Sequence, residues 1–552
     1  MTTPSLPRPF DRGLRRLVSG ARQLSPAAAV RRIKTDRQRS SFEAQLARLT
    51  ANSLVEPAAI GPGPVLVDGT FDNPNYWMRY SLLRAACGLA SRQEVGLTGP
   101  WRRREAARTF QRLGISALAD GRIDVGPFRA AAQALLAGTT DARAIMDWQL
   151  PEGLPGSILY DGLLKRQRAA SVSLGHPHLL DHVAEALGEL DFAARLVASR
   201  PWSLFALSHA INFRYGALAW TAARHGIPVV VCFGNYGTPR YWRVDSPADV
   251  FDSVDRPTGA VLDALPAARA GALTATGAEY LRRRLAGLTD DIGSIYAFQR
   301  NNQVVDRAAI ASAMAWPLDR PIVTVYASNW FDFPHAAGMT QYRDFLDWTQ
   351  VTLAAACAYK GASWLFRAHP CDQWYGGETL SDVMPTEAPP HVRLCPTAWH
   401  GAHVMAASDA VITVHGTVGI EAAMIGKPVM VADVGWYHDC GFTVWPKTAA
   451  AYAALAQSPW WRDVDTATAS SRAAAFAGIY FGAPAWQPPL VSGDDSEQGG
   501  LYQRLIAWLA ERPPALAREL ETIAAWMASG ERFYHTYKMR TTDSYTLTNV
   551  HD

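Results

Sequence analysis

The stretch VITVHGTVGIEAAMIGKPVMVADV, residues 411–434, has the pattern of a strand, a tight turn, a helix, a second turn and a second strand. Its first four residues are a largely apolar run, and apolar residues at helical spacing follow the turn. Thr417 is the expected N-cap of the helix, and Gly426 followed by Pro428 is expected to end it. The stretch therefore predicts a βαβ unit, in which a helix joins two parallel strands.

The polar chemistry of this unit gathers at its first turn, which consists of His415, Gly416 and Thr417. Free main-chain N–H groups and the positive end of the helix dipole at such a turn would bind a phosphate. Glu421, one turn further along, would reach a ribose hydroxyl. The alternative is a βαβ unit whose Gly and Thr serve only turn geometry and capping.

Length and composition indicate a globular protein with more than one domain. The chain has 552 residues, of which 49% are hydrophobic and 19% charged, and this length exceeds what one hydrophobic core usually organises. No apolar run approaches the length of a membrane span. Pro and Arg interrupt the first twenty residues, which lack the apolar region of a signal peptide, so we expect a cytoplasmic protein. The six cysteines are scattered, which indicates reduced thiols.

The charge is nearly balanced overall but uneven along the chain. A net charge of +3 gives no reason to expect a nucleic-acid partner. In the first forty residues, however, ten Arg and Lys residues accompany only two Asp residues. Leu14, Leu17, Val18 and Leu24 could form a short apolar stripe there, which would put a surface helix in peripheral contact with anionic lipid at the inner face of the cytoplasmic membrane. The alternative is a solvated, partly disordered arm.

Alternating strand and helix patterns divide the rest of the chain into two series, and such alternation predicts parallel sheets. The predicted elements of the first series are a strand at 65–67, helices at 80–90, 102–118 and 156–166, a strand at 203–207, a helix at 215–225 and a strand at 227–233. Those of the second series are a strand at 321–327, a helix at 342–359, a strand at 363–367 and the unit at 411–434. A mostly helical stretch, 261–315, separates the two series.

We therefore predict an α/β fold with two Rossmann-like domains that face each other across a cleft. The expected parts are a basic arm and helix over 1–55, an N-terminal Rossmann-like domain over 56–300, a C-terminal Rossmann-like domain over 301–490 and a C-terminal helical extension over 491–552. Ligands of open parallel sheets collect beyond the carboxyl ends of the strands. The residues at such ends are Asp68, Ser208 and His209 in the first series, and Ser328, Asn329, Arg367, His369, His415 and Thr417 in the second.

This placement predicts the layout of a nucleotide-sugar transferase, with an N-terminal acceptor domain and a C-terminal donor domain. Arg367 and an imidazolium at His369 would both neutralise the oxyanion of a leaving phosphate, while Pro370 fixes the exit of the loop. Asp68 is the candidate catalytic carboxylate, as a base on an acceptor hydroxyl or as a nucleophile. Asp68-Gly69 is equally a common turn.

Residues 72–80 are dense in aromatic and polar groups and are predicted to form a sugar-binding loop. Tyr76, Trp77 and Arg79, together with Ser208 and His209, are the candidates for binding the acceptor or sugar. The alternative for the aromatic residues is packing in the core.

A metal site is not expected. His400-Gly-Ala-His403 lies near other His and Cys residues in the sequence, but an H-x-x-H pair without a matching ligand pair is a weak signal.

Motifs across residues 60–450 also match a pattern found in other proteins. They are Tyr160-Asp161-Gly-Leu-Leu-Lys-Arg166; Ser208-His209 with Tyr215-Gly216 and Gly226-Ile-Pro228; Asp332-Phe-Pro-His335; Trp348; Arg367-Ala-His369-Pro370; and His415-Gly-Thr417-Val-Gly419-Ile-Glu421-Ala with Gly426-Lys-Pro428. Together these motifs resemble bacterial capsule and surface-polysaccharide biosynthesis proteins, whose relatives include transferases that use CMP-linked Kdo.

The resemblance implies the two-domain GT-B fold and a glycosyltransferase without a cofactor. Such an enzyme would move a sugar from a nucleotide-sugar donor to a growing surface polysaccharide or glycolipid. By this resemblance, His369 and Pro370 match the element that contacts the donor phosphate or nucleotide, and His415 to Glu421 match the nucleotide-binding turn and helix. The relatives commonly carry Ser or Asn where this chain has His415-Gly416, and the donor stays open between a CMP-linked sugar and a sugar diphosphate.

Two rival functions use the same architecture. One is a phosphotransferase that moves a polyol phosphate from a CDP-alcohol, with much the same anion-binding turn. The other is a nonenzymatic glycan-binding or scaffold protein that keeps the fold without the chemistry.

Overall fold

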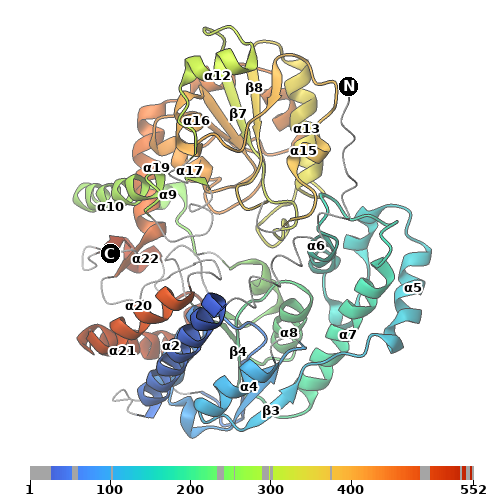
Figure 1. The fold of residues 1–552 in the computed structure, drawn as a ribbon, viewed down its shortest axis with the longest axis vertical. Helices are drawn as coiled ribbons and strands as arrows, with labels where there is room; N and C mark the ends of the chain where they lie inside the picture. Colours follow the sequence, from blue (N-terminus) through green and yellow to red (C-terminus); the bar gives the residue numbers. More distant parts are fainter. Residues whose placement is uncertain are drawn as a thin grey trace.

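The computed structural model contains two large, mainly parallel sheets, each covered by helices (Figure 1), and one small two-stranded sheet. It describes residues 26–51, 60–100, 103–232, 241–253, 255–288, 297–298, 302–372, 376–484, 498–511, 513–534, 537–542 and 547–549. In the view of Figure 1, the strands and helices around β7 and β8 occupy the upper part, and those around β4 occupy the lower part.

The first sheet has the strand order β3-β2-β1-β4-β5-β6. Its strands are β1 (Val65–Asp68), β2 (Glu94–Thr98), β3 (Ala117–Asp120), β4 (Leu204–Leu207), β5 (Val229–Val231) and β6 (Trp242–Val244). Neighbouring strands are parallel except β6, which joins β5 antiparallel. Every residue of β1, β4 and β5 is buried, as expected for apolar strands that are covered on both faces.

The second sheet has the order β11-β10-β7-β8-β9 and is parallel throughout. Its strands are β7 (Ile322–Tyr326), β8 (Ser363–Arg367), β9 (Val392–Leu394), β10 (Ala410–Thr413) and β11 (Val429–Val431). Strand order reverses between β1 and β4 in the first sheet and between β7 and β10 in the second. Such switch points are where open α/β sheets bind ligands.

Helices cover both sheets. Those that belong with the first sheet are α3 (Pro74–Ala86), α4 (Arg103–Arg112), α5 (Arg129–Ala137), α6 (Gly156–Gln167), α7 (Leu179–Ala198) and α8 (Phe213–Arg224). Those that belong with the second are α12 (Arg307–Met314), α13 (Phe345–Ala358), α15 (Leu380–Val383), α16 (Gly401–Ala407), α17 (Val418–Met424) and α18 (Ala449–Ala456). Short 3₁₀ helices span Leu89–Ser91, Gly126–Phe128, Ala142–Asp147, Pro151–Gly153, Pro247–Phe251 and Trp460–Asp463.

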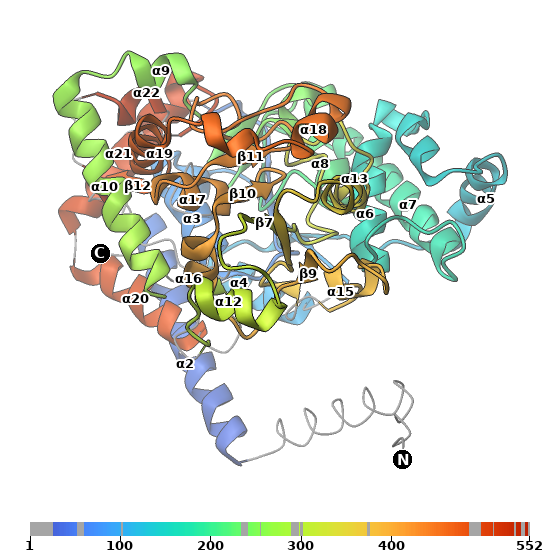
Figure 2. The same ribbon diagram turned by 90° about the horizontal axis from the view of Figure 1, so that it is seen from above.

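The helices before residue 300 do not all pack on the first sheet. Helices α9 (Gly259–Asp263) and α10 (Ala267–Leu285) lie against α19 (Thr466–Phe481), and Figure 2 shows α10 beside α19. The Tyr280 and Phe481 rings stack with centroids 3.9 Å apart, and Tyr280 shares a hydrophobic cluster with Ile420. The predicted boundary at 300/301 therefore cuts after two helices that pack with the second sheet.

Helices α2 and α21, which lie near the two ends of the described chain, both pack on α3. Helix α2 (Pro26–Ala51) contacts α3 and α20 (Gln498–Glu511), while α21 (Pro513–Ser529) contacts α3. The last described elements, α22 (Tyr537–Arg540) and β13 (Leu547–Asn549), lie against α19 and β12 (Gly482–Pro484). The C-terminal extension thus contacts both halves of the molecule.

The basic arm divides into two parts. The predicted stripe Leu14, Leu17, Val18 and Leu24 lies outside the described residues. Arg39, by contrast, belongs to α2 and donates to both carboxylate oxygens of Asp72 at 2.8 Å, so this part of the basic segment is anchored to the fold. No helix in the described ranges is long and apolar enough to cross a membrane.

The sequence predicted no strand at β2, β3, β6, β9, β12 or β13, and the first two of these show why. Strand β2 contains Glu94, whose buried carboxylate accepts hydrogen bonds from Arg84 at 2.7–2.9 Å, so a charged residue occupies a core strand because its partner lies on α3. Strand β3 is only half-buried and overlaps the last two residues of the predicted helix 102–118, of which α4 occupies the first part.

Candidate functional site

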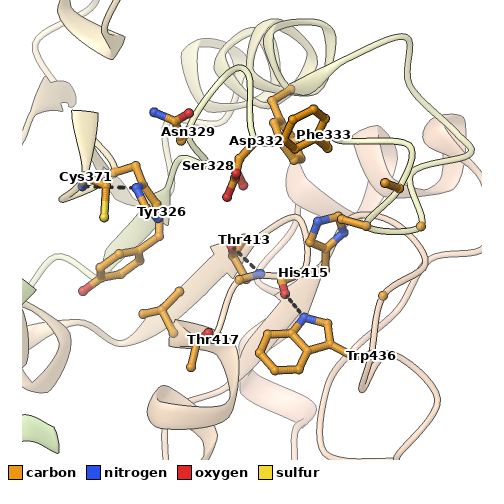
Figure 3. Close-up of a pocket in the computed structure, with 18 of the residues that line it drawn as sticks. Tyr326, Ser328, Asn329, Asp332, Phe333, Cys371, Thr413, His415, Thr417 and Trp436 are labelled. Carbon is orange, nitrogen blue, oxygen red and sulfur yellow. Dashed lines mark hydrogen bonds between the residues drawn. The ribbon is translucent and has the colours of Figure 1, made fainter. Parts of the chain in front are cut away.

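A cavity of about 630 Å³ is lined by loops that follow strands of both sheets. The first sheet contributes His209, Ala210 and Ile211, directly after β4. The second contributes the loops after β7, β8, β10 and β11, and Figure 3 shows residues of the β7 loop facing the turn after β10. Both switch points therefore open onto one cavity, whose volume lies in the range of small-molecule sites.

The predicted site residues fall into two groups. Those that line the cavity are His209, Arg367, His369, Pro370, His415, Gly416, Thr417 and Glu421. Those that do not line it are Asp68, Ser208, Tyr76, Trp77 and Arg79. Of the residues that the strand-end rule selected, all except Asp68 and Ser208 therefore line this cavity.

Arg367, the last residue of β8, has a guanidinium that is held from behind. One terminal nitrogen donates to the sulfur of Cys395 at 3.2 Å, and the other donates to the carbonyl of Trp399 at 2.9 Å. Two of its five N–H donors are used in this way. Arg367 is buried, with 8% of its surface exposed, and buried charges are normally paired. No carboxylate among the described residues forms an ion pair with it.

The other two cations of the cavity wall are already neutralised. Arg284 of α10 donates to the carboxylate of Glu421, and Arg256 donates to Asp439 at 2.8 Å. Arg367 is therefore the cavity-lining cation without an acidic partner in the described part of the chain. A buried, uncompensated positive charge favours an anionic ligand.

Burial favours the neutral form of His369 and His415 in the ligand-free protein. Burial lowers the pKa of His369, and it lowers the pKa of His415 to about 4. The Nδ1 of His369 accepts from the Cys371 N–H at 3.2 Å, so the proton of its ring is on Nε2. The Nδ1 of His415 lies 3.2 Å from the carbonyl of Val434, which can only accept, so its proton is on Nδ1. His369 can thus donate a hydrogen bond from Nε2, whereas Nε2 of His415 has a lone pair and can only accept.

The turn after β10 is held by two aromatic side chains. Trp436 donates from its indole to the carbonyl of His415 at 2.7 Å, and Tyr437 donates from its hydroxyl to the carbonyl of Gly416 at 2.5 Å. The Gly416 N–H donates to the Thr413 hydroxyl at 3.3 Å. Gly416 therefore does not offer the free N–H group that the sequence predicted.

The main-chain donors of this turn lie one and two residues further along. Thr417 occupies the N-cap position of α17, but its side chain makes no capping hydrogen bond. No described residue accepts a hydrogen bond from the N–H of Thr417 or Val418, and both residues line the cavity. These two N–H groups add to the donors at Arg367 and His369.

One carboxylate of the cavity wall, Asp332, belongs to a motif noted in the sequence but was not among the predicted site residues. Asp332 lies in the loop after β7, is exposed in the cavity wall, and makes no hydrogen bond or ion pair through its side chain with any described residue. The other acidic residues of the wall are paired, Asp252 with Arg532 at 2.7 Å and Glu421 with Arg284. The strand-end rule could have found Asp332 if it had been extended along the whole loop after β7. Asp332 lies four residues beyond Ser328 in that loop.

The expected sugar-binding loop is a helix. Asn73 accepts from the N–H of Asn75 and Pro74 takes the first helical position, so this segment starts α3. Tyr76, Trp77 and Arg79 are at most 2% exposed. The first two are core aromatics, whose polar atoms donate to Ala206 and Asp72. The aromatic density therefore reflects core packing, which was the alternative interpretation.

Within the described ranges, no three His, Cys, Asp or Glu side chains come together as a metal site would require. The architecture itself can be classified from its topology. Two Rossmann-like units, each with its switch point at a shared cavity, form the GT-B arrangement that the sequence predicted.

Comparisons with known proteins concern the fold. No family model and no curated protein match the chain. One similar solved structure is the KpsC β-Kdo 2,4 transferase of Thermosulfurimonas dismutans, at 15% identity over 49% of this chain and 78% of that one, with a TM-score of 0.31. Another is the spinosyn rhamnosyltransferase SpnG, at 13% identity over 83% and 100%, with a TM-score of 0.23.

A third similar structure is the UDP-GlcNAc 2-epimerase of Neisseria meningitidis bound to UDP-GlcNAc. Its identity is 12% over 75% of this chain and 97% of that one, with a TM-score of 0.22. At these values the fold assignment rests on strand order and cavity position.

Proposed function

We propose that the protein is a glycosyltransferase that uses a nucleotide-sugar donor. The observation that carries this proposal is Arg367, an uncompensated cation in a cavity at the switch points of two Rossmann-like sheets. A diphosphate or monophosphate ester would supply the missing negative charge. A sugar on that phosphate would extend toward the first sheet, because the cavity continues to His209.

The donor phosphate is proposed to bind beside β8 and β10. Arg367 supplies charge and N–H donors, His369 supplies Nε2–H, and Thr417 and Val418 supply main-chain N–H groups. Glu421 is proposed to accept from a ribose hydroxyl while it remains paired with Arg284, since a carboxylate has lone pairs for both.

The unpaired carboxylate of Asp332 is proposed to face the sugar ring. Ser328 and Asp332 lie across from Thr413 and His415 in Figure 3, on the side of the cavity where the β7 loop closes over the turn. A carboxylate there would accept hydrogen bonds from sugar hydroxyls and would stabilise positive charge that develops at the anomeric carbon.

A panel of free nucleotides tests the nucleotide pocket. We expect one of CMP, CDP, UDP and GDP to raise the melting temperature selectively, because a ligand at 100 times its Kd stabilises the folded state by about 2.7 kcal/mol. If none of the four nucleotides shifts the melting temperature at millimolar concentration, the proposal fails.

The acceptor is proposed to be a growing surface polysaccharide or glycolipid, on the basis of the motif resemblance. Mass spectrometry of the product tests this proposal, because a transferase adds the mass of the sugar alone. A product that carries a polyol phosphate would identify the rival phosphotransferase instead.

The affinity for nucleotide is expected to depend on the protonation of His415. In the free protein the pKa of His415 is about 4, because the ring is buried, and its Nε2 offers only a lone pair. A bound phosphate raises that pKa, so binding takes up a proton, and the contribution of His415 grows as pH falls from 8 toward 5. Calorimetry in buffers of different ionisation enthalpy measures this proton uptake.

His415→Asn is the matched variant for this experiment. The nucleotide's own phosphate also titrates near pH 6. The difference between wild type and His415→Asn removes that background, since both proteins bind the same ligand. Equal proton uptake by the two proteins would show that His415 does not contact the phosphate.

A further inference from the structure

Three consecutive polar groups link the buried end of β1 to the cavity. The Ser208 hydroxyl donates to one carboxylate oxygen of Asp68 at 2.5 Å, and His209 Nδ1 lies 3.0 Å from the same Ser208 oxygen. Asp68 also accepts from the Ser208 N–H at 3.3 Å and from the N–H and hydroxyl of Thr70 at 2.7 and 2.6 Å. All four of these groups are donors, so the Asp68 carboxyl group acts as the acceptor in each of these hydrogen bonds.

The number of protons fixes the tautomer of His209. Ser208 has one hydroxyl proton, and Asp68 receives it. The Ser208 oxygen can therefore only accept from His209, which must carry its proton on Nδ1. Nε2 of the neutral ring then has a lone pair.

Of the three hydrogen-bonded residues Asp68, Ser208 and His209, only His209 can reach a substrate. Asp68 and Ser208 are both 0% exposed and do not line the cavity, whereas His209 does. The ring is fixed between Phe71 and Tyr215, with centroid distances of 4.7 and 5.1 Å. Burial lowers the pKa of His209 to about 4, partly offset by the charge of Asp68, so the ring is neutral at pH 7.

We propose that His209 is the catalytic base that removes the proton of the acceptor hydroxyl, and that Asp68 and Ser208 are positioning residues that fix its tautomer. This inference rests on the proposed glycosyltransferase function. It moves the chemical role that the sequence assigned to Asp68 onto His209, because the carboxylate has no access to the cavity.

The proton and electron balance of the step is simple. The acceptor O–H gives its proton to Nε2 of His209, and the acceptor oxygen forms a bond to the anomeric carbon. Over the whole transfer, the bond from that carbon to the donor phosphate breaks, and the phosphate oxygen keeps the electron pair. The imidazolium is stabilised by Asp68 through Ser208 and then releases its proton to water.

Long-range ¹H–¹⁵N spectra of the histidine-labelled full chain test the tautomer directly. The His209 signals are assigned by their loss in His209→Gln. We expect a protonated Nδ1 in wild type and a shift toward protonated Nε2 in Ser208→Ala, where the acceptor for Nδ1–H is missing. Asp68→Asn is the second variant, and it is expected to shift the tautomer in the same direction.

Thr70→Val is the matched control for a purely structural role. It removes the other hydroxyl that donates to Asp68, at nearly the same distance, but leaves Ser208 and His209 in place. We expect the His209 tautomer to be unchanged in Thr70→Val. A wild-type ring protonated on Nε2, or the same tautomer in Thr70→Val, Ser208→Ala and Asp68→Asn, would overturn the relay.

Nucleotide release from CMP-, UDP- and GDP-sugars tests the catalytic role. We expect His209→Gln to lower the turnover of the accepted donor at least 100-fold, within the usual range for loss of a general base, and to leave the nucleotide-induced melting shift intact. Wild-type turnover by His209→Gln would refute the base. Failure of every nucleotide to bind would instead refute the proposed function, and the tautomer spectra would still decide the relay.

Discussion

Arg367→Ala is expected to weaken nucleotide binding at least 100-fold, which corresponds to about 2.7 kcal/mol. Arg367 is the cation of the cavity wall that no described carboxylate neutralises, and its remaining N–H donors have no other partner there. Charge-assisted hydrogen bonds contribute about 1.5–3 kcal/mol each. The loss of two such bonds between the guanidinium and the phosphate therefore suffices for this effect. Isothermal calorimetry with the nucleotide identified in the melting panel measures it.

Arg256→Ala is the matched control. Arg256 also lines the cavity, but its guanidinium is already paired with Asp439 at 2.8 Å. We expect its loss to weaken nucleotide binding less than tenfold. If both alanine variants lose the same affinity, then general positive charge holds the nucleotide, and the specific role of Arg367 is refuted.

Asp161→Ala is expected to lower the free energy of unfolding by about 3 kcal/mol. Asp161 lies on α6, and its buried carboxylate accepts from His335 Nδ1 at 2.6 Å and from the N–H groups of His335 and Ala336 at 3.1 and 3.2 Å. These donors belong to the loop after β7, so the variant leaves three partly buried donors unpaired between the two halves of the molecule. Urea unfolding followed by tryptophan fluorescence measures the change.

An exposed aspartate on the next helix provides the comparison for this variant. Asp191 of α7 pairs with Arg195 one turn along, and both side chains are largely exposed. Such pairs contribute about 0–1 kcal/mol, so Asp191→Ala should change stability little. Equal losses in Asp161→Ala and Asp191→Ala would mean that Asp161 does not hold the β7 loop against α6.

The sequence predicted the strands of the parallel sheets best, because a strand that is buried on both faces is a continuous apolar run. Strand β8 covers the predicted residues 363–367, and β1 and β4 lie within one residue of their predicted ranges. Strand β2 was missed because Glu94 interrupts its apolar run, and the partner that makes this burial possible is Arg84, on a different element. The prediction of strands failed where a buried polar residue on one element is stabilised by a partner on another element.

The same reasoning explains the errors in the candidate site. Tyr76, Trp77 and Arg79 have the composition of a sugar-binding loop, but Asn73 and Pro74 start a helix there that turns these side chains into the core. Residue type alone cannot distinguish a buried aromatic from an exposed one. The strand-end rule worked better, since topology places every strand end of a parallel sheet at the same edge.

The sequence by itself determined the α/β class, the βαβ unit at 411–434 and the set of strand ends from which the cavity is built. These follow from local periodicity and turn chemistry, which act over a few residues. The tertiary structure decided which charges remain unpaired. Glu421 meets Arg284 from 137 positions away, and Arg256 meets Asp439 from 183. Neither Arg367 nor Asp332 forms an ion pair with a described residue, although the charge of Asp332 acts on Lys165. Whether a charged side chain is neutralised depends on all the charges near it in space. Only the fold could therefore show which charged groups of the cavity are left for a phosphate and a sugar to bind.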